Sequence, residues 1–249
     1  MITSLRNPRI AGVRRLRRTR ERKVKGRTPV EGPFLLEEAI RAGVIIHEVY
    51  AAPDDATTAA TCERIGIEQT LVSNEVLASL ASSVSPRGPV AVVSVPASAA
   101  IRPMDSIVMW DVSDPGNAGT IIRSAAAFGF QVIATAGCVD LWSPKVVRAG
   151  VGGHFRTPLV DTTELSPQVL MGAGLRAFVA AAGSSTSPTE MVETVGPVAI
   201  IVGNEAHGVP EAVREGSGAV PISLTMPGGT ESLNVGVAAS ILMYLRTGE

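Results

Sequence analysis

The chain has 249 residues and a formal net charge of −1, and 45% of its residues are hydrophobic. These values predict a folded protein of one large or two small domains and exclude a disordered or repetitive polypeptide. The charge is unevenly distributed, because 11 of the 22 lysines and arginines lie within residues 1–27, where Glu21 is the single acid. Such asymmetry favours an anionic partner for the N-terminus, with nucleic acid first.

The cysteines and the N-terminus bear on the cellular compartment. Cys62 and Cys138 are far apart and match no metal or redox spacing, so we expect free thiols in a reducing environment. The N-terminus is rich in arginine but lacks the apolar segment of a secretory signal. A mitochondrial presequence has a similar composition and stays open as an alternative, but we expect a cytoplasmic protein without a membrane partner.

The first predicted element is a basic helix within residues 1–27. Asn7 and Pro8 are typical of a helix start, and Ile10, Val13 and Leu16 follow at near-helical spacing. The other faces are filled by arginines, which could form a solvated surface. Self-repulsion makes that arrangement costly, so we expect phosphate contacts instead. The candidate RNA-binding residues of this segment are Arg14, Arg15, Arg17 and Arg18.

Strands and helices alternate in the next part of the chain, which indicates a small α/β domain over residues 1–95. The pattern predicts helices over residues 34–42, 56–65 and 73–80, and strands over 44–52, 67–72 and 89–95. The proline-flanked stretch PASAAIRP then predicts a linker over residues 96–104.

Residues 105–249 predict a second α/β domain with a mainly parallel sheet. The expected strands are 106–112, 131–135, 175–182, 197–202 and 220–224, and the expected helices are 115–128, 211–215 and 235–245. Between them, residues 143–156 predict a helix that leads into a glycine-rich turn. Lys145 and Arg148 lie there in an otherwise acidic half of the chain, which favours an RNA contact. The dinucleotide signature G-x-G-x-x-G is absent.

Polar side chains follow the carboxyl ends of several predicted strands. Asn117, Glu205, Ser232 and Asn234 all occupy such positions, where ligands bind in open α/β sheets. Ser232 also stands where the N-cap of the last helix is expected. Arg123 lies six residues after Asn117 in an otherwise apolar helix, so we expect it to have a partner.

Three stretches of the chain carry a family resemblance. DPGNAGTIIRSAAAFG, IIVGNEAHGVP and ISLTMPGGTESLNVGVAAS resemble, in order, the three motifs of the SpoU (TrmH-type) family of RNA ribose 2′-O-methyltransferases, within the SPOUT superfamily. The resemblance runs from Asp105 to the C-terminus. Residues 1–95, with NPRI and EGPFLL, resemble the family's N-terminal substrate-binding domain, which is similar to ribosomal RNA-binding proteins.

The resemblance implies a deep trefoil knot that holds S-adenosylmethionine mainly through backbone contacts, and a homodimer with its sites at the subunit interface. No metal is implied. By motif position, the implied active residues are Asn117, Arg123, Glu205, Ser232 and Asn234. The implied cofactor residues are Ala181, Ala182, Val202, Gly203, Asn204, Leu224, Met226 and Leu233.

We therefore expect S-adenosylmethionine-dependent methylation of a ribose 2′-hydroxyl in structured RNA, with 23S ribosomal RNA favoured. Arg123 is expected to act through its fixed charge, because a guanidinium is not deprotonated in proteins. Asn117 would orient Arg123 and the substrate, and Glu205 would position that network or take the proton. Three alternatives stay open: ribose methylation of tRNA, methylation of a base nitrogen, and a non-catalytic RNA-binding protein.

Overall fold

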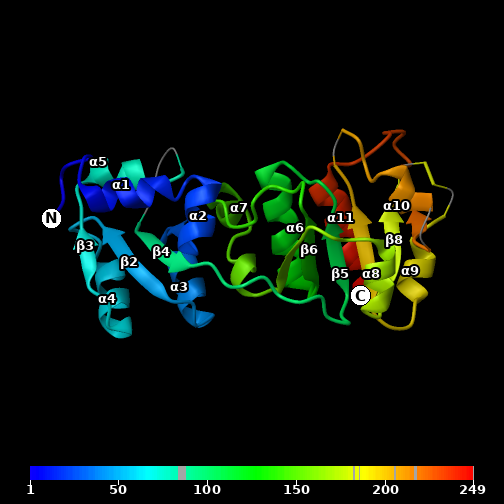
Figure 1. Cartoon of the computed structure of the whole chain (residues 1–249), viewed down its shortest axis with the longest axis horizontal. Coiled ribbons are helices and arrows are strands. Elements are labelled where there is room, and N and C mark those ends of the chain that lie inside the picture. The colour runs from blue at the N-terminus through cyan, green and yellow to red at the C-terminus, as the bar shows by residue number, and fades with distance from the viewer. Residues whose placement is uncertain (84–87, 182, 185, 205, 216–217, 249) are drawn as a thin grey trace. The chain divides into compact units, whose positions relative to one another are not determined.

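The computed structural model describes residues 1–249 except 84–87, 182, 185, 205, 216–217 and 249. The chain forms two compact units (Figure 1). Unit 1 contains residues 1–97 and 142–155, and unit 2 contains residues 98–141 and 156–249. The predicted linker is divided between them. From Ser98 onward it is bound to unit 2, where Asp161 N donates to Ser98 Oγ at 2.9 Å and Arg102 N to Gln131 Oε1 at 3.1 Å.

Unit 1 is built on a four-stranded sheet in the order β1-β4-β2-β3. The β1–β4 and β4–β2 pairs are antiparallel, and β2–β3 is parallel. The strands are β1 (Arg27–Glu31), β2 (Ile46–Ala51), β3 (Gln69–Leu71) and β4 (Val90–Ser94). The helices are α1 (Pro8–Arg15), α2 (Thr19–Lys25), α3 (Pro33–Arg41), α4 (Ala56–Ile65), α5 (Asn74–Leu80) and α7 (Pro144–Ala149), with the 3₁₀ turn η1 (Gly153–Phe155).

The predicted basic helix is in fact two short helices, so the expectation of one continuous element within residues 1–27 was wrong. The buried Arg22 guanidinium explains the break. Its Nη1 donates to the carbonyls of Leu16 and Arg17 at 2.7 and 2.8 Å, just beyond the end of α1. These carbonyls lack helical partners, and a basic side chain satisfies them. Arg22 is therefore structural, and the apolar residues Ile10, Val13 and Leu16 pack into the core of unit 1.

Strand β1 was not predicted, because it begins with a charge and contains Pro29 at its centre. Proline cannot donate to a sheet ladder and is tolerated at an edge. β1 is an edge strand, paired to β4 alone, with Pro29 opposite Val92. The sheet accommodates a sequence that would break a central strand.

The segment that carries α7 belongs to unit 1, although the chain reaches it after two strands of unit 2. Val147 packs into the core that Val30 and Leu36 help to form, and Trp142 and Phe155 pack against the same cluster. Thr28 Oγ1 donates to the Trp142 carbonyl at 2.8 Å. The basic residues of α7 therefore share a unit with the basic residues of α1 and α2.

Unit 2 contains a six-stranded sheet in the order β10-β8-β9-β5-β6-β7, and every neighbouring pair is parallel. The strands are β5 (Ser106–Met109), β6 (Gln131–Thr135), β7 (Leu159–Thr162), β8 (Arg176–Ala180), β9 (Val198–Val202) and β10 (Val220–Ile222). The helices are α6 (Pro115–Phe128), α8 (Pro167–Gly172), α9 (Thr189–Glu193), α10 (Glu211–Glu215) and α11 (Val235–Thr247). The predicted parallel α/β sheet is confirmed. β7, α8 and α9 were not predicted, and the trefoil knot stays a prediction.

Helices α6 and α11 pack against each other and against strands of the sheet, α6 on β5 and β6 and α11 on β9. Small residues permit their close approach. A Cβ added to Gly236 would lie 3.2 Å from the Thr120 side chain, and the hydroxyls of Ser124 and Ser240 are 2.7 Å apart. This contact brings the N-terminal ends of two helices together, beside the site described next.

Candidate active site

A cavity of about 770 Å³ lies in unit 2 at the carboxyl ends of three neighbouring parallel strands. Ala180, Val202 and Ile222 are the last residues of β8, β9 and β10, and all three line it. The opposite wall includes Val235, Ala238 and Leu242 of α11. Parallel sheets bind ligands at this edge, because the loops that follow the strands converge there.

The cavity gathers most of the residues that the sequence predicted for a cofactor site. Those that line it are Ala181, Val202, Gly203, Asn204, Leu224, Met226 and Leu233, together with Ser232 and Asn234 from the predicted active residues. Ala182 and Glu205 lie outside the described residues. Asn117 and Arg123 do not line the cavity. Sequence reasoning missed Thr230 and Glu231, which also line it and come from the glycine-rich loop before α11.

The loop after β9 is tightly folded around Gly203 and Asn204. A Cβ on Gly203 would lie 2.3 Å from the Gly208 carbonyl carbon, so glycine alone fits there. The Asn204 Oδ1 accepts hydrogen bonds from Ala206 N at 2.8 Å and His207 N at 3.3 Å. Gly203 and Asn204, which line the cavity, are therefore held by close backbone contact with Gly208 and by the hydrogen bonds of the Asn204 side chain.

Asp111 holds this loop from outside the cavity and was not predicted. Its carbonyl accepts a hydrogen bond from Asn204 Nδ2 at 2.9 Å, and its backbone has the unusual φ of 55°. Its Oδ1 accepts from Thr135 Oγ1 at 3.2 Å. The sequence analysis placed Asp111 inside the strand predicted over residues 106–112, whereas β5 ends at Met109, so the available signal was an acid within an apolar stretch.

Asn234 connects the two helices beside the cavity. It is the N-cap of α11, where its Oδ1 accepts from Gly236 N and Val237 N at 2.9 and 3.2 Å. Its Nδ2 donates to Asn117 Oδ1, in the first turn of α6, at 2.8 Å. The prediction that Ser232 caps the helix was wrong, because asparagine caps equally well and the helix begins at Val235.

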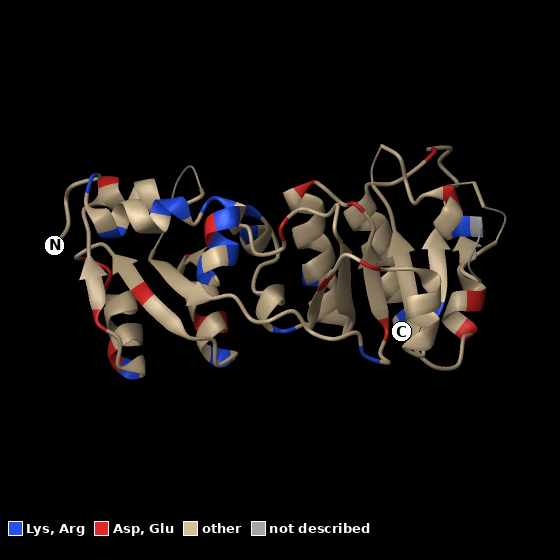
Figure 2. Cartoon of the chain, in the orientation of Figure 1, with Lys and Arg blue, Asp and Glu red and all other residues tan. Residues whose placement is uncertain are grey.

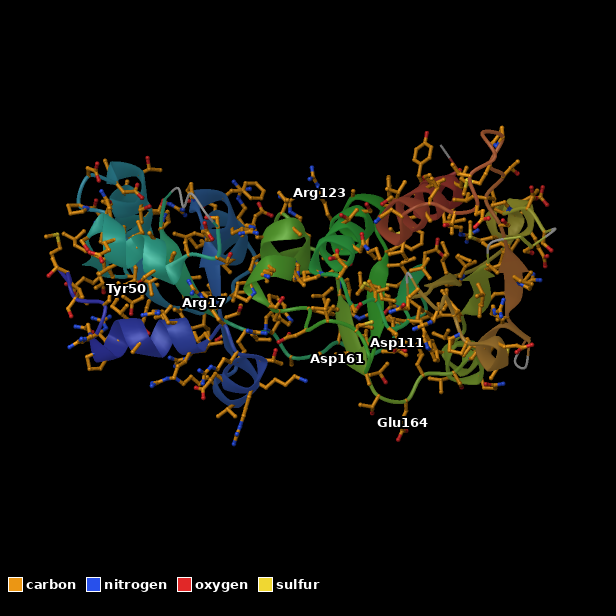
Figure 3. All side chains as sticks on the ribbon, turned by 90° about the horizontal axis from the view of Figure 1, so that it is seen from above. Arg17, Tyr50, Asp111, Arg123, Asp161 and Glu164 are labelled. Atoms are coloured by element: carbon orange, nitrogen blue, oxygen red, sulfur yellow. The ribbon has the colours of Figure 1, made fainter. Side chains whose placement is uncertain are left out.

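Arg123 lies on the exposed side of α6, and Figure 3 shows it reaching outward from that helix. It makes no ion pair or side-chain hydrogen bond with any residue that the structure describes, so the expected partner is not found within those residues. Its apolar neighbours Ile121 and Ile122 are buried on other sides of the helix. The exposed position explains how one arginine is tolerated in an apolar helix, since water can solvate it.

The predicted RNA-binding residues all belong to unit 1, and Figure 2 shows lysine and arginine gathered along α1 and α2. Arg14, Arg15, Arg18 and Lys145 are exposed. Arg17 is partly engaged, because its Nη2 donates to the carbonyls of Ser79 and Ala81 at 2.7 and 2.6 Å.

Arg148 reaches the same turn that Arg17 binds, since its Nη1 donates to Ser82 Oγ at 3.2 Å. The turn after α5 therefore binds arginines from two segments of the chain that are far apart in sequence. This arrangement makes α7 and the end of α1 parts of one basic region.

The profile of the SpoU rRNA methylase family matches residues 105–244, and that of the MRM3-like substrate binding domain matches residues 7–91. The first match spans more than half of the chain. The chain belongs to the SpoU rRNA methylase family. It is thus an RNA methyltransferase with an N-terminal substrate-binding domain, which confirms the resemblance of the three motifs.

Relatives of this SpoU methylase match it over nearly its whole length. It is 32% identical to an uncharacterised tRNA/rRNA methyltransferase of Synechocystis, over 98% of this chain and 92% of the relative. It is 30% identical to the 23S rRNA (guanosine(2553)-2′-O)-methyltransferase RlmP of Bacillus subtilis, over 98% and 97%. It also resembles the AdoMet-bound rRNA methyltransferase from Sinorhizobium meliloti, with a TM-score of 0.86, 26% identity and coverage of 98% and 96%.

The described residues contain neither a metal-binding cluster nor a membrane-spanning helix. In that part of the SpoU methylase, no group of three or more His, Cys, Asp or Glu side chains is arranged to hold a metal ion. Nor does any described helix combine the length and apolar character needed to cross a membrane. Cys62 and Cys138 are both free, and burial raises the pKa of each thiol.

Proposed function

We propose that this SpoU methylase transfers a methyl group from S-adenosylmethionine to a ribose 2′-hydroxyl of 23S ribosomal RNA. The observation that carries the proposal is the cavity at the ends of β8, β9 and β10, with Asn234 at its wall and Asn117 bound to Asn234. The 2′-O-methyltransferase from Bacillus subtilis, similar over nearly the whole chain, supports the choice of ribose and of 23S rRNA.

The cavity suits S-adenosylmethionine in size and chemistry. Its volume of about 770 Å³ lies in the range of small-molecule sites, roughly 300–1,000 Å³. Apolar side chains such as Leu224, Met226 and Leu233 would cover the adenosine and the methionine chain, while the backbone around Gly203 supplies hydrogen-bonding groups. When bound, the cofactor supplies a methyl group activated by its positive sulfur.

The protein's own contribution would be orientation and electrostatics. The first turns of α6 and α11 meet at the Asn117–Asn234 hydrogen bond, so the positive ends of two helix dipoles lie together beside the cavity. That potential would stabilise negative charge developing on a ribose oxygen. Arg123 would hold an RNA phosphate, because its guanidinium is exposed and permanently charged. Glu205 remains our candidate for the group that takes the proton.

We also propose that the protein acts as a homodimer in the cytoplasm. Helix α11 supports the dimer, because it exposes large hydrophobic side chains. Val237, Tyr244 and Leu245 are 44%, 49% and 37% exposed. Val237 and Tyr244 are seven residues apart, so they share one face. A second copy of the chain would remove this apolar surface from water.

The test is to incubate the protein with S-adenosylmethionine and, in separate reactions, unmodified ribosomal RNA and tRNA. Nuclease digestion and mass spectrometry then identify the methylated nucleoside. A 2′-O-methylated nucleoside from 23S rRNA is the expected product. A methylated base, methylation of tRNA alone, or RNA binding without methylation would each contradict the proposal. Gly203→Ala is the negative control, because its Cβ would overlap Gly208 and should abolish cofactor binding.

A further inference from the structure

A second cavity, of about 220 Å³, lies in unit 1 between α1 and the sheet. It is not part of the predicted RNA-binding set, of which only Arg15 lines it. We call it the α1 groove. Its polar and small lining residues come from α1, the end of α2, β1 and β2; they are Arg9, Gly12, Arg15, Lys25, Arg27 and Glu48.

The charges of the α1 groove are unbalanced. Glu48 is the single acid among the described residues that line it, and its carboxylate is already engaged by Arg9 Nη2 at 3.3 Å and by the Tyr50 hydroxyl. The side chains of Arg15, Lys25 and Arg27 make no ion pair or hydrogen bond with any residue in the described part of the chain. Three uncompensated positive charges around one cavity repel each other, and a bound anion would offset that repulsion.

A neighbouring histidine reports the same positive potential. The β2–β4 register shifts between Ile46 and Glu48, and His47 Nε2 is 2.8 Å from Ser94 Oγ. Ser94 is the residue opposite Arg27 in the β1–β4 register. Burial and the charge of Arg27 together lower the pKa of His47. Arg27 therefore acts on this imidazole as a positive charge, while Glu48, the acid of the groove, acts on it in the opposite direction.

The shape and lining of the α1 groove limit what it can bind. Its volume equals that of about seven liquid waters at ~30 Å³ each, which is enough for a phosphodiester and part of its ribose. None of the described residues that line it is aromatic, and the nearby Tyr50 is fully buried, so those residues offer a base no surface on which to stack. A Cβ on Gly12 would meet no atom within 4 Å, so the helix surface is open there.

We propose that the α1 groove binds a phosphodiester of the RNA backbone, through Arg15, Lys25 and Arg27 and without reading sequence. The inference rests on the proposed function, in that the RNA is the methylation substrate. The groove would fix the position of the RNA on unit 1, because a phosphate inside a walled cavity is held more closely than one on an open surface. It adds a defined site to the exposed basic region of α1, α2 and α7.

Two kinds of variant of the full chain test the site. Gly12→Leu fills the groove without changing charge, and alanine or leucine in place of a helical glycine favours the helix by up to about 1 kcal/mol. Arg15→Gln with Arg27→Gln removes two charges from the groove. The matched control is Arg20→Gln with Lys23→Gln, which removes two exposed charges that neither line the groove nor belong to the predicted RNA-binding residues.

Binding is measured by fluorescence anisotropy with a labelled 16-nucleotide RNA hairpin over a range of NaCl concentrations. Both groove variants should weaken binding at least fivefold at about 0.1 M NaCl and lower the slope of log K against log salt by about 0.7–0.9, as expected for one lost phosphate contact. The control pair should weaken binding less. The inference is overturned if Gly12→Leu binds like the wild type, or if the two charge pairs have equal effects.

Further measurements separate this inference from the proposed function. Thermal unfolding and calorimetric binding of S-adenosylmethionine should be unchanged in folded groove variants. Suppose that the groove variants bind the hairpin weakly but the wild type methylates no ribosomal RNA. The proposed function is then refuted, and the proposed phosphodiester site is supported. If the groove variants methylate ribosomal RNA with unchanged kcat/KM, the proposed phosphodiester site is refuted and the proposed function is supported. Full displacement of the hairpin by low-millimolar inorganic phosphate would indicate a free-anion site and overturn the RNA assignment.

Discussion

The Asn234 side chain both caps α11 and donates from Nδ2 to Asn117 Oδ1 at 2.8 Å, which joins the first turns of α6 and α11. Its two functions can be separated by substitution. Asn234→Asp keeps the capping oxygen but loses the amide donor, so stability should change by less than about 0.5 kcal/mol while kcat falls roughly tenfold or more. Asn234→Ala should also lose about 1 kcal/mol of stability. Urea unfolding and single-turnover methylation measure the two effects.

Ser240→Ala is the control for the two substitutions of Asn234. It removes the hydrogen bond to Ser124 between the same two helices, at a residue that does not line the cavity. We expect a loss of about 1 kcal/mol of stability with kcat unchanged. If Ser240→Ala lowers kcat as much as Asn234→Asp does, the Asn117–Asn234 contact matters only for packing.

Arg123 should contribute to turnover without contributing to stability. The exposed guanidinium has no partner among the described residues, so Arg123→Ala should abolish methyl transfer while leaving the unfolding free energy and the affinity for S-adenosylmethionine nearly unchanged. Arg123→Lys keeps the charge but loses the planar fork and should be severely impaired. Calorimetry and single-turnover assays on the same samples decide this. Arg214→Ala, at another exposed arginine of unit 2, is the control. Loss of cofactor binding in folded Arg123→Ala would refute the assignment.

The α7 residues Lys145 and Arg148 should contribute to RNA affinity. Deleting residues 1–27 would be a poor test of the basic region, because it removes the buried Ile10 and β1 residue Arg27. The double substitution Lys145→Gln with Arg148→Gln should instead weaken binding about tenfold and lower the salt slope by about 1–2.

Arg41→Gln with Arg64→Gln is the matched control for α7. Arg41 and Arg64 form ion pairs with Glu38 and Glu37 in the same unit. The Arg64–Glu37 pair is exposed and contributes little to stability, whereas Glu38 is buried, so urea unfolding checks that the Arg41 substitution leaves the variant folded. Anisotropy with a structured RNA fragment should show a smaller effect for this pair. Equal losses in both double variants would mean that only the total charge of unit 1 matters.

The exposed face of α11 should form a subunit interface. Val237→Glu with Tyr244→Glu places two charges on that face and should give a monomer in multi-angle light scattering at micromolar concentration, where the wild type should be a dimer. Val195→Glu is the control, since Val195 is fully exposed elsewhere in unit 2. A wild-type monomer, or dissociation by Val195→Glu alone, would argue against this interface.

Glu31 should make unit 1 sensitive to acid. Burial opposes its ionisation, but hydrogen bonds from Ser83 and Ser82 outweigh burial and hold the pKa of the carboxyl below its usual 4.5. A lowered folded-state pKa stabilises the fold above the unfolded pKa, and that contribution is lost as pH falls through the folded-state value. Glu31→Gln should therefore cost about 1 kcal/mol at neutral pH, after allowance for solvent screening, and less at about pH 3.5.

Urea unfolding at the two pH values measures this difference, with Glu63→Gln at an exposed position of α4 as control. The deficit of Glu31→Gln relative to the wild type should shrink on acidification. A deficit that is equal at both pH values would show that the carboxylate charge does not contribute.

Local patterns in the sequence were sufficient to predict many of the helices and strands of unit 2. The continuous apolar run of β6 predicted Gln131–Thr135 with the bounds that the structure has, and the Asp114-Pro115-Gly116 turn marked the start of α6. The predicted cofactor residues that are described all line one cavity. The predictions of β6 and of the start of α6 succeeded because hydrophobic periodicity and helix caps depend on neighbouring residues, whereas the cofactor residues stay a prediction.

The sequence by itself determined the α/β class, the basic N-terminus and the family motifs. The tertiary structure alone decided which distant residues meet. Asn117 and Asn234 form a hydrogen bond across 117 positions, Val147 packs with unit 1, and Pro29 lies in an edge strand. Such contacts depend on strand order and helix packing. Strand order and helix packing follow from burying apolar surface over the whole chain, so no local period in the sequence specifies them.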